Sequence, residues 1–304
     1  MGQRVIVIVG PTCSGKTYLS IQVASLLKSE IISADSRQIY KKLNIGTAKP
    51  SQADLSKIKH HLINILNPDE NYDANKFSLE AENIITNLID EGRIPVVTGG
   101  TGLYIKALID GMIDSANKND ELREELLQKK KQFGNEYLYE ELKIIDPQSA
   151  LKMLPQNWKR VIRAIEVFHT TGKPIWQHQN SQKKKSNFNF FQFGLLWNRS
   201  TLYTNINNRV DRMISDELVE EVENILNQGY DKNLNSLNTV GYKEIISYLE
   251  GDISLDRAIE LIKRNTRHYA KRQMTWFNAD KRIKWYKISS YNDLDKLAYE
   301  IQSL

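Results

Sequence analysis

Residues 4–17 read RVIVIVGPTCSGKT, and this stretch decides the fold. Residues 5–9 form a short run of β-branched apolar side chains, which is the pattern of a strand buried on both faces. The run is too short and too lightly flanked to be a signal peptide. Residues 10–17 match the phosphate-binding pattern GxxxxGK[ST]. A strand followed by such a loop and then by a helical pattern predicts an α/β protein with a P-loop.

The loop has a physical reason for each of its key positions. Gly10 and Gly15 permit the tight backbone that turns N–H groups toward phosphate oxygens. The N-terminus of the following helix adds positive potential. Lys16 supplies a charge for the terminal phosphates, and the Thr17 hydroxyl suits a Mg²⁺ ligand. The pattern therefore predicts a bound polyphosphate and leaves open which one.

The rest of the chain alternates strand and helix signals and then changes character. Strands are expected near residues 30–34 and 94–98, and helices over 16–28 and 77–91, which is the doubly wound pattern. Residues 118–170 are charged and helix-rich, residues 177–187 form a polar loop or hinge, and residues 190–197 read as a returning strand. We therefore expect a P-loop NTPase-like parallel sheet core from residues 1–114 and 188–304. An all-helical insertion takes residues 115–187.

Composition excludes several classes of protein. No run of ~18 apolar residues exists, so no membrane-spanning helix is expected. The single cysteine, Cys13, excludes an internal disulfide and a cysteine-rich zinc site, and it fits a reducing cytoplasm. Net charge is +5, and basic residues crowd residues 257–284, where only Glu260 and Asp280 oppose them. Such a stripe, which includes Lys271 and Arg272, indicates a polyanion partner or a solvated helix face.

Two further segments follow predicted strands. Asp35 follows the second strand, at the sheet edge where ligands bind in this fold, and it can serve as general base, Mg²⁺ ligand or helix N-cap. The glycines of residues 99–102 permit close approach of a ligand, or form a plain turn, and Thr101 can hydrogen-bond a substrate group.

Other candidates lie on predicted helices. Arg160 and Arg163 share a helix face, and they, like Arg209, can bind an anion or form a salt bridge. Aromatic residues within 269–277 can stack on unpaired bases or pack in the core.

Together these segments resemble the tRNA dimethylallyltransferase (tRNA isopentenyltransferase) family of bacterial type. The matching strings are GPTCSGKT, SADSRQIY, IGTAKP, HHLINILNPDE, GGTGLYIKAL, KRVIRAIEV, TVGYKE and KRQMTWF, in the family's order and over almost the whole chain. The most specific feature is DSRQIY followed by IGTAKP. The chain also lacks the Cys/His zinc finger of longer eukaryotic relatives.

The resemblance implies a reaction and a set of residues. The family transfers a dimethylallyl group from dimethylallyl diphosphate to N6 of the adenosine at tRNA position 37, with Mg²⁺, and releases diphosphate. Asp35 matches the general base, and Lys16, Thr17 and Arg209 match the residues that act on the diphosphate. The implied diphosphate site is Gly10, Pro11, Thr12, Cys13, Ser14, Gly15, Lys16, Thr17 and Arg209. The implied tRNA contacts are Asp35, Ser36, Arg37, Gln38, Thr101, Arg123, Lys159, Arg160, Val161, Ile162, Arg163, Thr239, Val240, Gly241, Tyr242, Lys243 and Glu244.

The expected partner is the anticodon stem-loop of tRNA, held by the helical insertion, and we expect a cytoplasmic monomer. Four residues depart from the family pattern: Asn205 and Asn278 stand in place of arginines, Asn157 in place of an aspartate, and Glu217 in place of a glycine. The proposed catalytic set is intact.

Three other functions fit parts of the sequence. A small-molecule kinase would share the P-loop, but it would use a lid arginine pair rather than a basic helical insertion. Prenyl transfer to free AMP would have no use for the basic C-terminal stripe. A non-catalytic RNA-binding P-loop protein would not need the Asp35, Lys16 and Thr17 set. Fold alone does not separate these functions.

Overall fold

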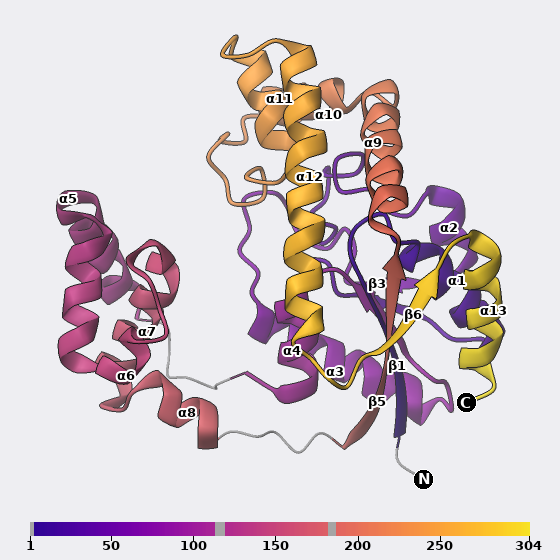
Figure 1. Cartoon of the computed structure of the whole chain (residues 1–304), viewed down its shortest axis with the longest axis horizontal. Helices are drawn as coiled ribbons and strands as arrows, with labels where there is room; N and C mark the ends of the chain where they lie inside the picture. The colour runs from indigo at the N-terminus through magenta and orange to yellow at the C-terminus, as the bar shows by residue number, and fades with distance from the viewer. Residues whose placement is uncertain (1–2, 113–118, 182–186) are drawn as a thin grey trace. The chain divides into compact units, whose positions relative to one another are not determined.

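The computed structural model describes residues 3–112, 119–181 and 187–304, and Figure 1 shows its trace. Six strands form one parallel sheet in the order β3-β2-β4-β1-β5-β6. The strands are β1 (Gln3–Val9), β2 (Ile31–Ser33), β3 (His60–His61), β4 (Val96–Gly99), β5 (Phe188–Trp197) and β6 (Lys284–Ile288). The predicted parallel α/β core is confirmed.

Side chains of the central strand alternate between two apolar layers. Ile6 and Ile8 join a cluster that includes residues of α1 (Lys16–Leu26) and α13 (Tyr291–Gln302). Val5, Val7 and Val9 join the opposite cluster, with residues of α3 (Ala74–Asp90) and α4 (Gly102–Asp110). Both faces of β1 are buried over residues 5–9, which explains why this part of the strand is continuously apolar rather than alternating.

A third cluster holds the helices that follow β5. Its centre includes Tyr242, Leu218 and Ile262, all nearly or fully buried. The helices that contribute to it are α9 (Arg199–Ser215), α10 (Leu218–Asn227), α11 (Tyr242–Leu249) and α12 (Leu255–Asn278). This cluster also takes Ile39, Tyr40 and Leu43 from the loop after β2, so it fixes that loop beside the sheet.

The chain divides into two compact units, residues 1–109 with 186–304, and residues 110–185. The second unit contains α5 (Asp120–Ile145), α6 (Pro147–Ala150), a 3₁₀ turn (Pro155–Asn157), α7 (Trp158–Thr171) and α8 (Ile175–Ser181). It has its own core, which includes Leu126, Leu142 and Ile165. The backbone of Gly134 (φ 87°) breaks the helical geometry inside α5, and a glycine adopts that conformation without a Cβ clash.

The sequence patterns missed four short elements. β3 has two residues and β6 has five, so neither offers a hydrophobic period long enough to distinguish it from a loop. The expectation of a loop or hinge over residues 177–187 is wrong for its first part, because α8 extends to Ser181. The lysine run at 183–185 lies outside the described residues. A short helix, α2 (Gln52–Lys57), was also not predicted.

Candidate active site

The P-loop lies between β1 and α1, and three residues give it its curvature. Gly10 has φ +150° and Gly15 has φ +85°, both in the region that side chains disfavour. Cys13, between them, also takes a left-handed φ of 63°, which the glycine pattern did not predict. The indole N–H of Trp197, on β5, donates to the Ser14 carbonyl at 2.9 Å. The loop is therefore anchored from the neighbouring strand as well as by its own backbone.

The Lys16 ammonium lies beneath this loop. Its Nζ donates to the Pro11 carbonyl at 2.6 Å. Burial, and next the positive charge of Arg209, lower the pKa of Lys16 to about 8. A buried ammonium beside a guanidinium makes a place where an anion is favoured, because a bound diphosphate would stabilise both positive charges.

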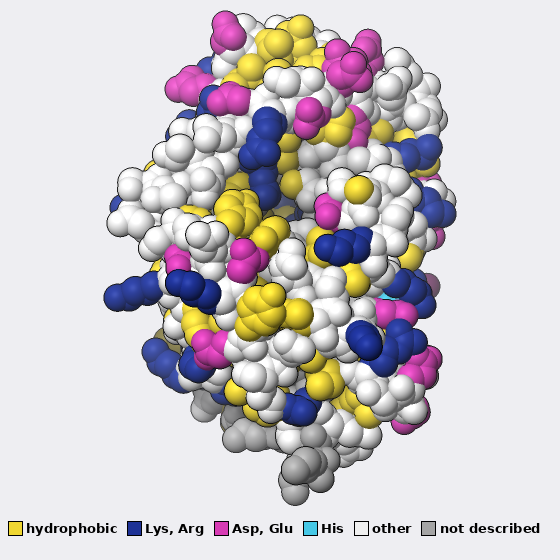
Figure 2. Space-filling model, turned by 90° about the vertical axis from the view of Figure 1, so that its right-hand side faces the viewer, with side chains coloured by type: hydrophobic (Ala, Val, Ile, Leu, Met, Phe, Trp, Pro, Cys, Tyr) yellow, Lys and Arg dark blue, Asp and Glu magenta, His cyan; other side chains and the backbone are white. Residues whose placement is uncertain are grey.

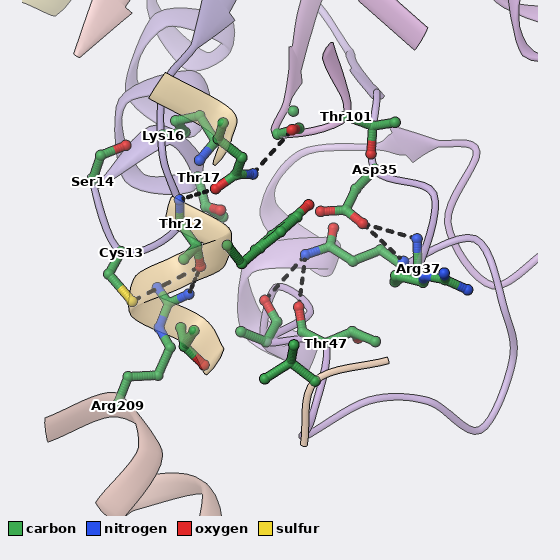
Figure 3. A pocket seen from close by; sticks show the side chains of 18 of the residues that line it. Thr12, Cys13, Ser14, Lys16, Thr17, Asp35, Arg37, Thr47, Thr101 and Arg209 are labelled. Carbon is green, nitrogen blue, oxygen red and sulfur yellow. Dashed lines mark hydrogen bonds between the residues drawn. The ribbon is translucent and has the colours of Figure 1, made fainter. Parts of the chain in front are cut away.

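Arg209 reaches the loop from α9. Its guanidinium donates to the Thr12 hydroxyl at 3.2 Å, as Figure 3 shows. Asn205 and Asn208 line the same pocket from this helix, so Asn205, which replaces the arginine of the family pattern, occupies a pocket position. α9 thus brings one guanidinium and two amides to the side of the P-loop.

Asp35 lies across the pocket from Lys16 (Figure 3). Its Oδ1 accepts from the N–H groups of Arg37 at 2.9 Å and Gln38 at 3.4 Å. These two bonds fix the plane of the carboxylate, and in Figure 3 the other oxygen points toward the P-loop side. The residues after Asp35 form turns rather than an α-helix, so the carboxylate caps a turn and not a helix.

The neighbours of Asp35 are tied to the other loops of this sheet edge. The Ser36 N–H donates to Thr101 Oγ1 at 3.0 Å, which joins the β2 and β4 loops. Gln38 Nε2 donates to the carbonyls of Thr47 (3.3 Å) and Ala48 (3.2 Å). These loops therefore hold one another before any substrate binds.

These elements enclose a pocket of about 830 Å³, lined by the P-loop, residues 35–38, residues 46–48 and the turn at 98–103, with side chains from α9 and α12. Its wall is mixed: cations and hydroxyls from the loops stand beside apolar and aromatic side chains such as Met213, Val240 and Tyr269. One face of the molecule is hollowed in this manner, with Lys or Arg side chains beside hydrophobic ones (Figure 2). A pocket of this character fits an anion that carries a small apolar group.

Residues 239–244 were predicted to contact tRNA, and the structure divides them. Thr239, Val240 and Lys243 line the pocket. Tyr242 and Glu244 are buried, and the Tyr242 hydroxyl donates to Glu221 at 2.6 Å. The prediction of direct contact is wrong for these two side chains, because they hold the loop from inside. Gly241 is buried as well, with its N–H bonded to Glu244.

The helical unit divides its predicted tRNA contacts in the same way. Lys159 and Arg160 are exposed on α7, whereas Val161 and Ile162 are core residues of this unit. The prediction of contact is therefore wrong for the side chains of Val161 and Ile162, because the apolar face of the helix is buried within the unit.

Arg123 and Arg163, the other two predicted contacts of this unit, converge on one carboxylate. Their guanidiniums lie 3.5 Å and 3.3 Å from Glu166, which is 2% exposed. Arg123 comes from α5 and Arg163 from α7, so a buried carboxylate holds two cations from different helices near the surface of the unit.

The basic stripe is not one continuous face. Its first part lies on α12, but residues 281–284 lie beyond the end of that helix. Arg257 pairs with Glu260, and Lys263 lies 2.5 Å from Asp211. Lys271 and Arg272 are exposed. The aromatic segment divides: Phe277 is a core residue, whereas Tyr269 and Trp276 line the pocket, and stacking on bases stays a prediction for these two.

Reasoning from the sequence missed two residues that hold this site together. Glu221, on α10, accepts hydrogen bonds from the N–H groups of Asn44, Ile45 and Gly46. Gln273, on α12, contacts the P-loop. Glu221 lies outside the family strings, and Gln273 lies within KRQMTWF but was given no role, because each acts on a loop far away in the chain and only the fold brings them together.

Among the described residues no group of three or more His, Cys, Asp or Glu side chains forms a metal cage. Thr17 and Asp35 nevertheless line the same pocket. That donor set fits Mg²⁺, which takes one or two protein oxygens and completes its shell with phosphate oxygens and water.

Within the described ranges, no helix has both the length and the apolar character needed to cross a bilayer.

The parallel sheet, the P-loop and the carboxylate opposite it define a phosphate-binding α/β enzyme core. The family model described as IPP transferase matches residues 38–280. The chain belongs to this IPP transferase family.

Relatives support the family along nearly the whole chain. The tRNA dimethylallyltransferase of Alkaliphilus oremlandii is 48% identical over 98% of this chain and 96% of its own length. That of Pelotomaculum thermopropionicum is 45% identical, with 98% and 95% covered.

Solved structures agree in fold. A tRNA isopentenylpyrophosphate transferase from Staphylococcus epidermidis has a TM-score of 0.71 at 37% identity and covers 98% of both chains. A eukaryotic dimethylallyltransferase acting on tRNA has a TM-score of 0.85 at 28% identity, with 98% of this chain and 77% of that chain covered.

Proposed function

We propose that this protein transfers a dimethylallyl group from dimethylallyl diphosphate to N6 of the adenosine at position 37 of tRNA and releases diphosphate. The observation that carries the proposal is the placement of a P-loop and a fixed carboxylate on opposite sides of one pocket. The P-loop side suits the leaving diphosphate, and Asp35 suits the attacking amine. Relatives that share nearly the whole chain carry the corresponding name.

The reaction follows from these positions. The N6 lone pair attacks C1 of the dimethylallyl group. The bond between C1 and the ester oxygen of the diphosphate breaks, and its electron pair leaves with the diphosphate. Asp35 accepts the N6 proton through Oδ2, the carboxylate oxygen that does not bind the N–H groups of Arg37 and Gln38. The P-loop N–H groups, Lys16 and Arg209 stabilise the charge that grows on the leaving group. Mg²⁺, when bound at Thr17, adds positive charge at the diphosphate.

The adenine must leave its stack to enter the pocket. We propose that Ser36, Arg37, Gln38 and Thr101 contact it or its neighbours. Lys243, Lys271 and Arg272 would bind the backbone of the RNA. The helical unit of residues 110–185, equivalent to the insertion expected at 115–187, would hold the anticodon stem through Arg123, Lys159, Arg160 and Arg163. We place the enzyme, as a monomer, in the cytoplasm, where its tRNA substrate lies.

A transfer assay tests the proposal. Labelled dimethylallyl diphosphate and Mg²⁺ are mixed with unmodified tRNA, with the same tRNA lacking adenosine at position 37, or with AMP. Label in the first acceptor alone supports the proposal. Label in AMP assigns the enzyme to AMP prenylation, and turnover of ATP with no label in any acceptor favours the kinase alternative.

A further inference from the structure

Gln273 joins two walls of the pocket from α12. Its side chain is buried, with 6% of the residue exposed. Its Oε1 accepts the Thr12 N–H at 2.7 Å, and its Nε2 donates to the Gly100 carbonyl at 2.9 Å. These partners fix the orientation of the amide, because a backbone N–H must meet an acceptor and a carbonyl must meet a donor. One side chain thus spans the P-loop and the turn after β4.

The turn is shaped to admit this amide. A Cβ added at Gly100 would lie 2.1 Å from Gln273 Nε2, closer than two such atoms can approach. The glycine at this position is therefore explained by the approach of Gln273. Gly100 therefore serves packing against α12, whereas a Cβ at Gly99 would lie 2.1 Å from the carbonyl oxygen of Ala34.

Thr12 is held from two helices at once. Gln273 takes its backbone N–H, and Arg209 donates to its hydroxyl at 3.2 Å. A P-loop N–H that already has a protein acceptor is not available to a phosphate. Thr12 therefore anchors the edge of the loop to α9 and α12. The N–H groups of the loop nearer α1 remain available to bind the anion.

The Nε2 end of the Gln273 side chain is linked, through Gly100, to the side of the pocket proposed for the adenine acceptor. Gly100 directly precedes Thr101, whose hydroxyl accepts the Ser36 N–H, and Ser36 follows Asp35. Gln273 is thus connected to the Asp35 loop through the turn at Gly100 and Thr101. It is connected directly to the P-loop, which lies on the opposite side of the pocket. A change in its length or hydrogen bonding would alter the separation of the two sides.

We propose that Gln273 is a positioning residue that sets the gap between the diphosphate loop and the turn bearing Thr101, which keeps the leaving group and the acceptor in register. This inference rests on the proposed function for its kinetic consequence, but its effect on the P-loop does not require tRNA. Misplacement by about 1 Å is enough to lower the rate of an oriented reaction by ~10²-fold.

The test uses Gln273→Met, which keeps the length of the side chain and removes both hydrogen bonds. We expect kcat for transfer to fall about 10- to 100-fold. The affinity for inorganic diphosphate, measured by calorimetry without tRNA, falls about fivefold or more, because the free energy of one hydrogen bond that held the P-loop in its binding conformation is lost. Thr275→Ala is the matched control, because Thr275 is exposed on the same helix and bonds only its own helix carbonyl.

Gln273→Glu separates positioning from stability. A protonated glutamic acid accepts from Thr12 and donates to Gly100 as the amide does, whereas the ionised form opposes the carbonyl and the diphosphate. Burial raises the pKa of a carboxyl, so the kcat of this variant relative to wild type rises as the pH is lowered from about 8 to about 5.5. Because this comparison is made within one variant at different pH values, it gives a result even where Gln273→Met folds poorly.

Unchanged kcat and diphosphate affinity in Gln273→Met overturn the inference. A lower melting temperature with normal kinetics, or a pH profile of Gln273→Glu parallel to wild type, overturns it as well. Failure of the proposed function looks different: wild type would bind diphosphate and transfer nothing to tRNA, while Gln273→Met would still weaken diphosphate binding.

Discussion

The two sides of the pocket are built in opposite ways. The side proposed for the diphosphate is one continuous segment, residues 10–17, whose curvature comes from its own backbone dihedrals and whose position is held by Trp197, Gln273 and Arg209. The acceptor side is assembled from several loops that bond one another, such as Ser36 to Thr101 and Gln38 to Thr47. A continuous motif keeps its curvature locally and takes only its anchoring contacts from distant residues. An assembled wall depends on distant residues, and its function is therefore sensitive to substitutions that touch no substrate.

The largest effect is expected at the single reacting group of the acceptor side. Asp35→Ala should lower the transfer rate by ~10²–10⁴-fold, because the N6 proton loses its acceptor. Binding of tRNA, measured by filter retention, should remain, since the proposed RNA contacts are spread over many other residues. Turnover near the wild-type rate would remove Asp35 from the role of base and reduce the contrast between the two sides.

Glu221 supports the assembled wall without reaching the chemistry. Glu221→Ala should lower the free energy of unfolding by about 1–3 kcal/mol, because it removes the acceptor of three consecutive N–H groups and of the Tyr242 hydroxyl. The KM for tRNA should rise as the loop at residues 44–48 loosens. Urea unfolding measures the first effect and steady-state kinetics the second. The adjacent exposed Glu220→Ala is the control, and equal effects at both positions would contradict the assignment.

The pH dependence of diphosphate affinity tests the side of the pocket formed by residues 10–17. Lys16 has a pKa lowered to about 8, so its ammonium is charged below that pH and loses its proton above it. A diphosphate binds the charged form, so affinity should fall by up to about tenfold per pH unit above this pKa. Calorimetry with inorganic diphosphate from about pH 7 to about pH 9.5 measures this fall. Lys16→Arg stays charged over this range and should give a flat profile. A flat wild-type profile would show that Lys16 stays protonated.

A smaller effect is expected at the exposed cations of α12 for which we propose contact with the RNA. Lys271→Ala with Arg272→Ala should weaken tRNA binding and reduce the slope of log affinity against log salt by about 1–2, because each cation that neutralises a phosphate contributes about one unit or less to that slope. Lys287→Ala with Lys296→Ala removes the same charge from other exposed positions. Equal slopes for the two double variants would mean that these α12 cations are merely solvated.

The smallest effect concerns backbone strain at the start of α10. Glu217 has a left-handed φ of 70°, at a position where the family pattern has glycine. Glu217→Gly should stabilise the fold by about 1 kcal/mol, because glycine adopts this conformation without a Cβ clash. Glu220→Gly, inside the helix, should destabilise by a similar amount. Urea unfolding checks both signs, and a loss of stability at Glu217 would contradict the account.

What the sequence determined by itself is local. The P-loop, the apolar central strand and the position of Asp35 at a strand end follow from spacing and periodicity within a few residues. The helical character of the insertion follows in the same way. These features are encoded by neighbours in the chain, so a pattern a few residues long is enough to predict them.

What only the tertiary structure decided is which distant side chains meet. Neighbouring residues of one string separate by burial: Lys243 lines the pocket, whereas Tyr242 and Glu244 are buried behind its wall. Gln273 and Glu221 meet loops more than a hundred residues away. No local period encodes such a contact, because packing of whole helices against the sheet sets it.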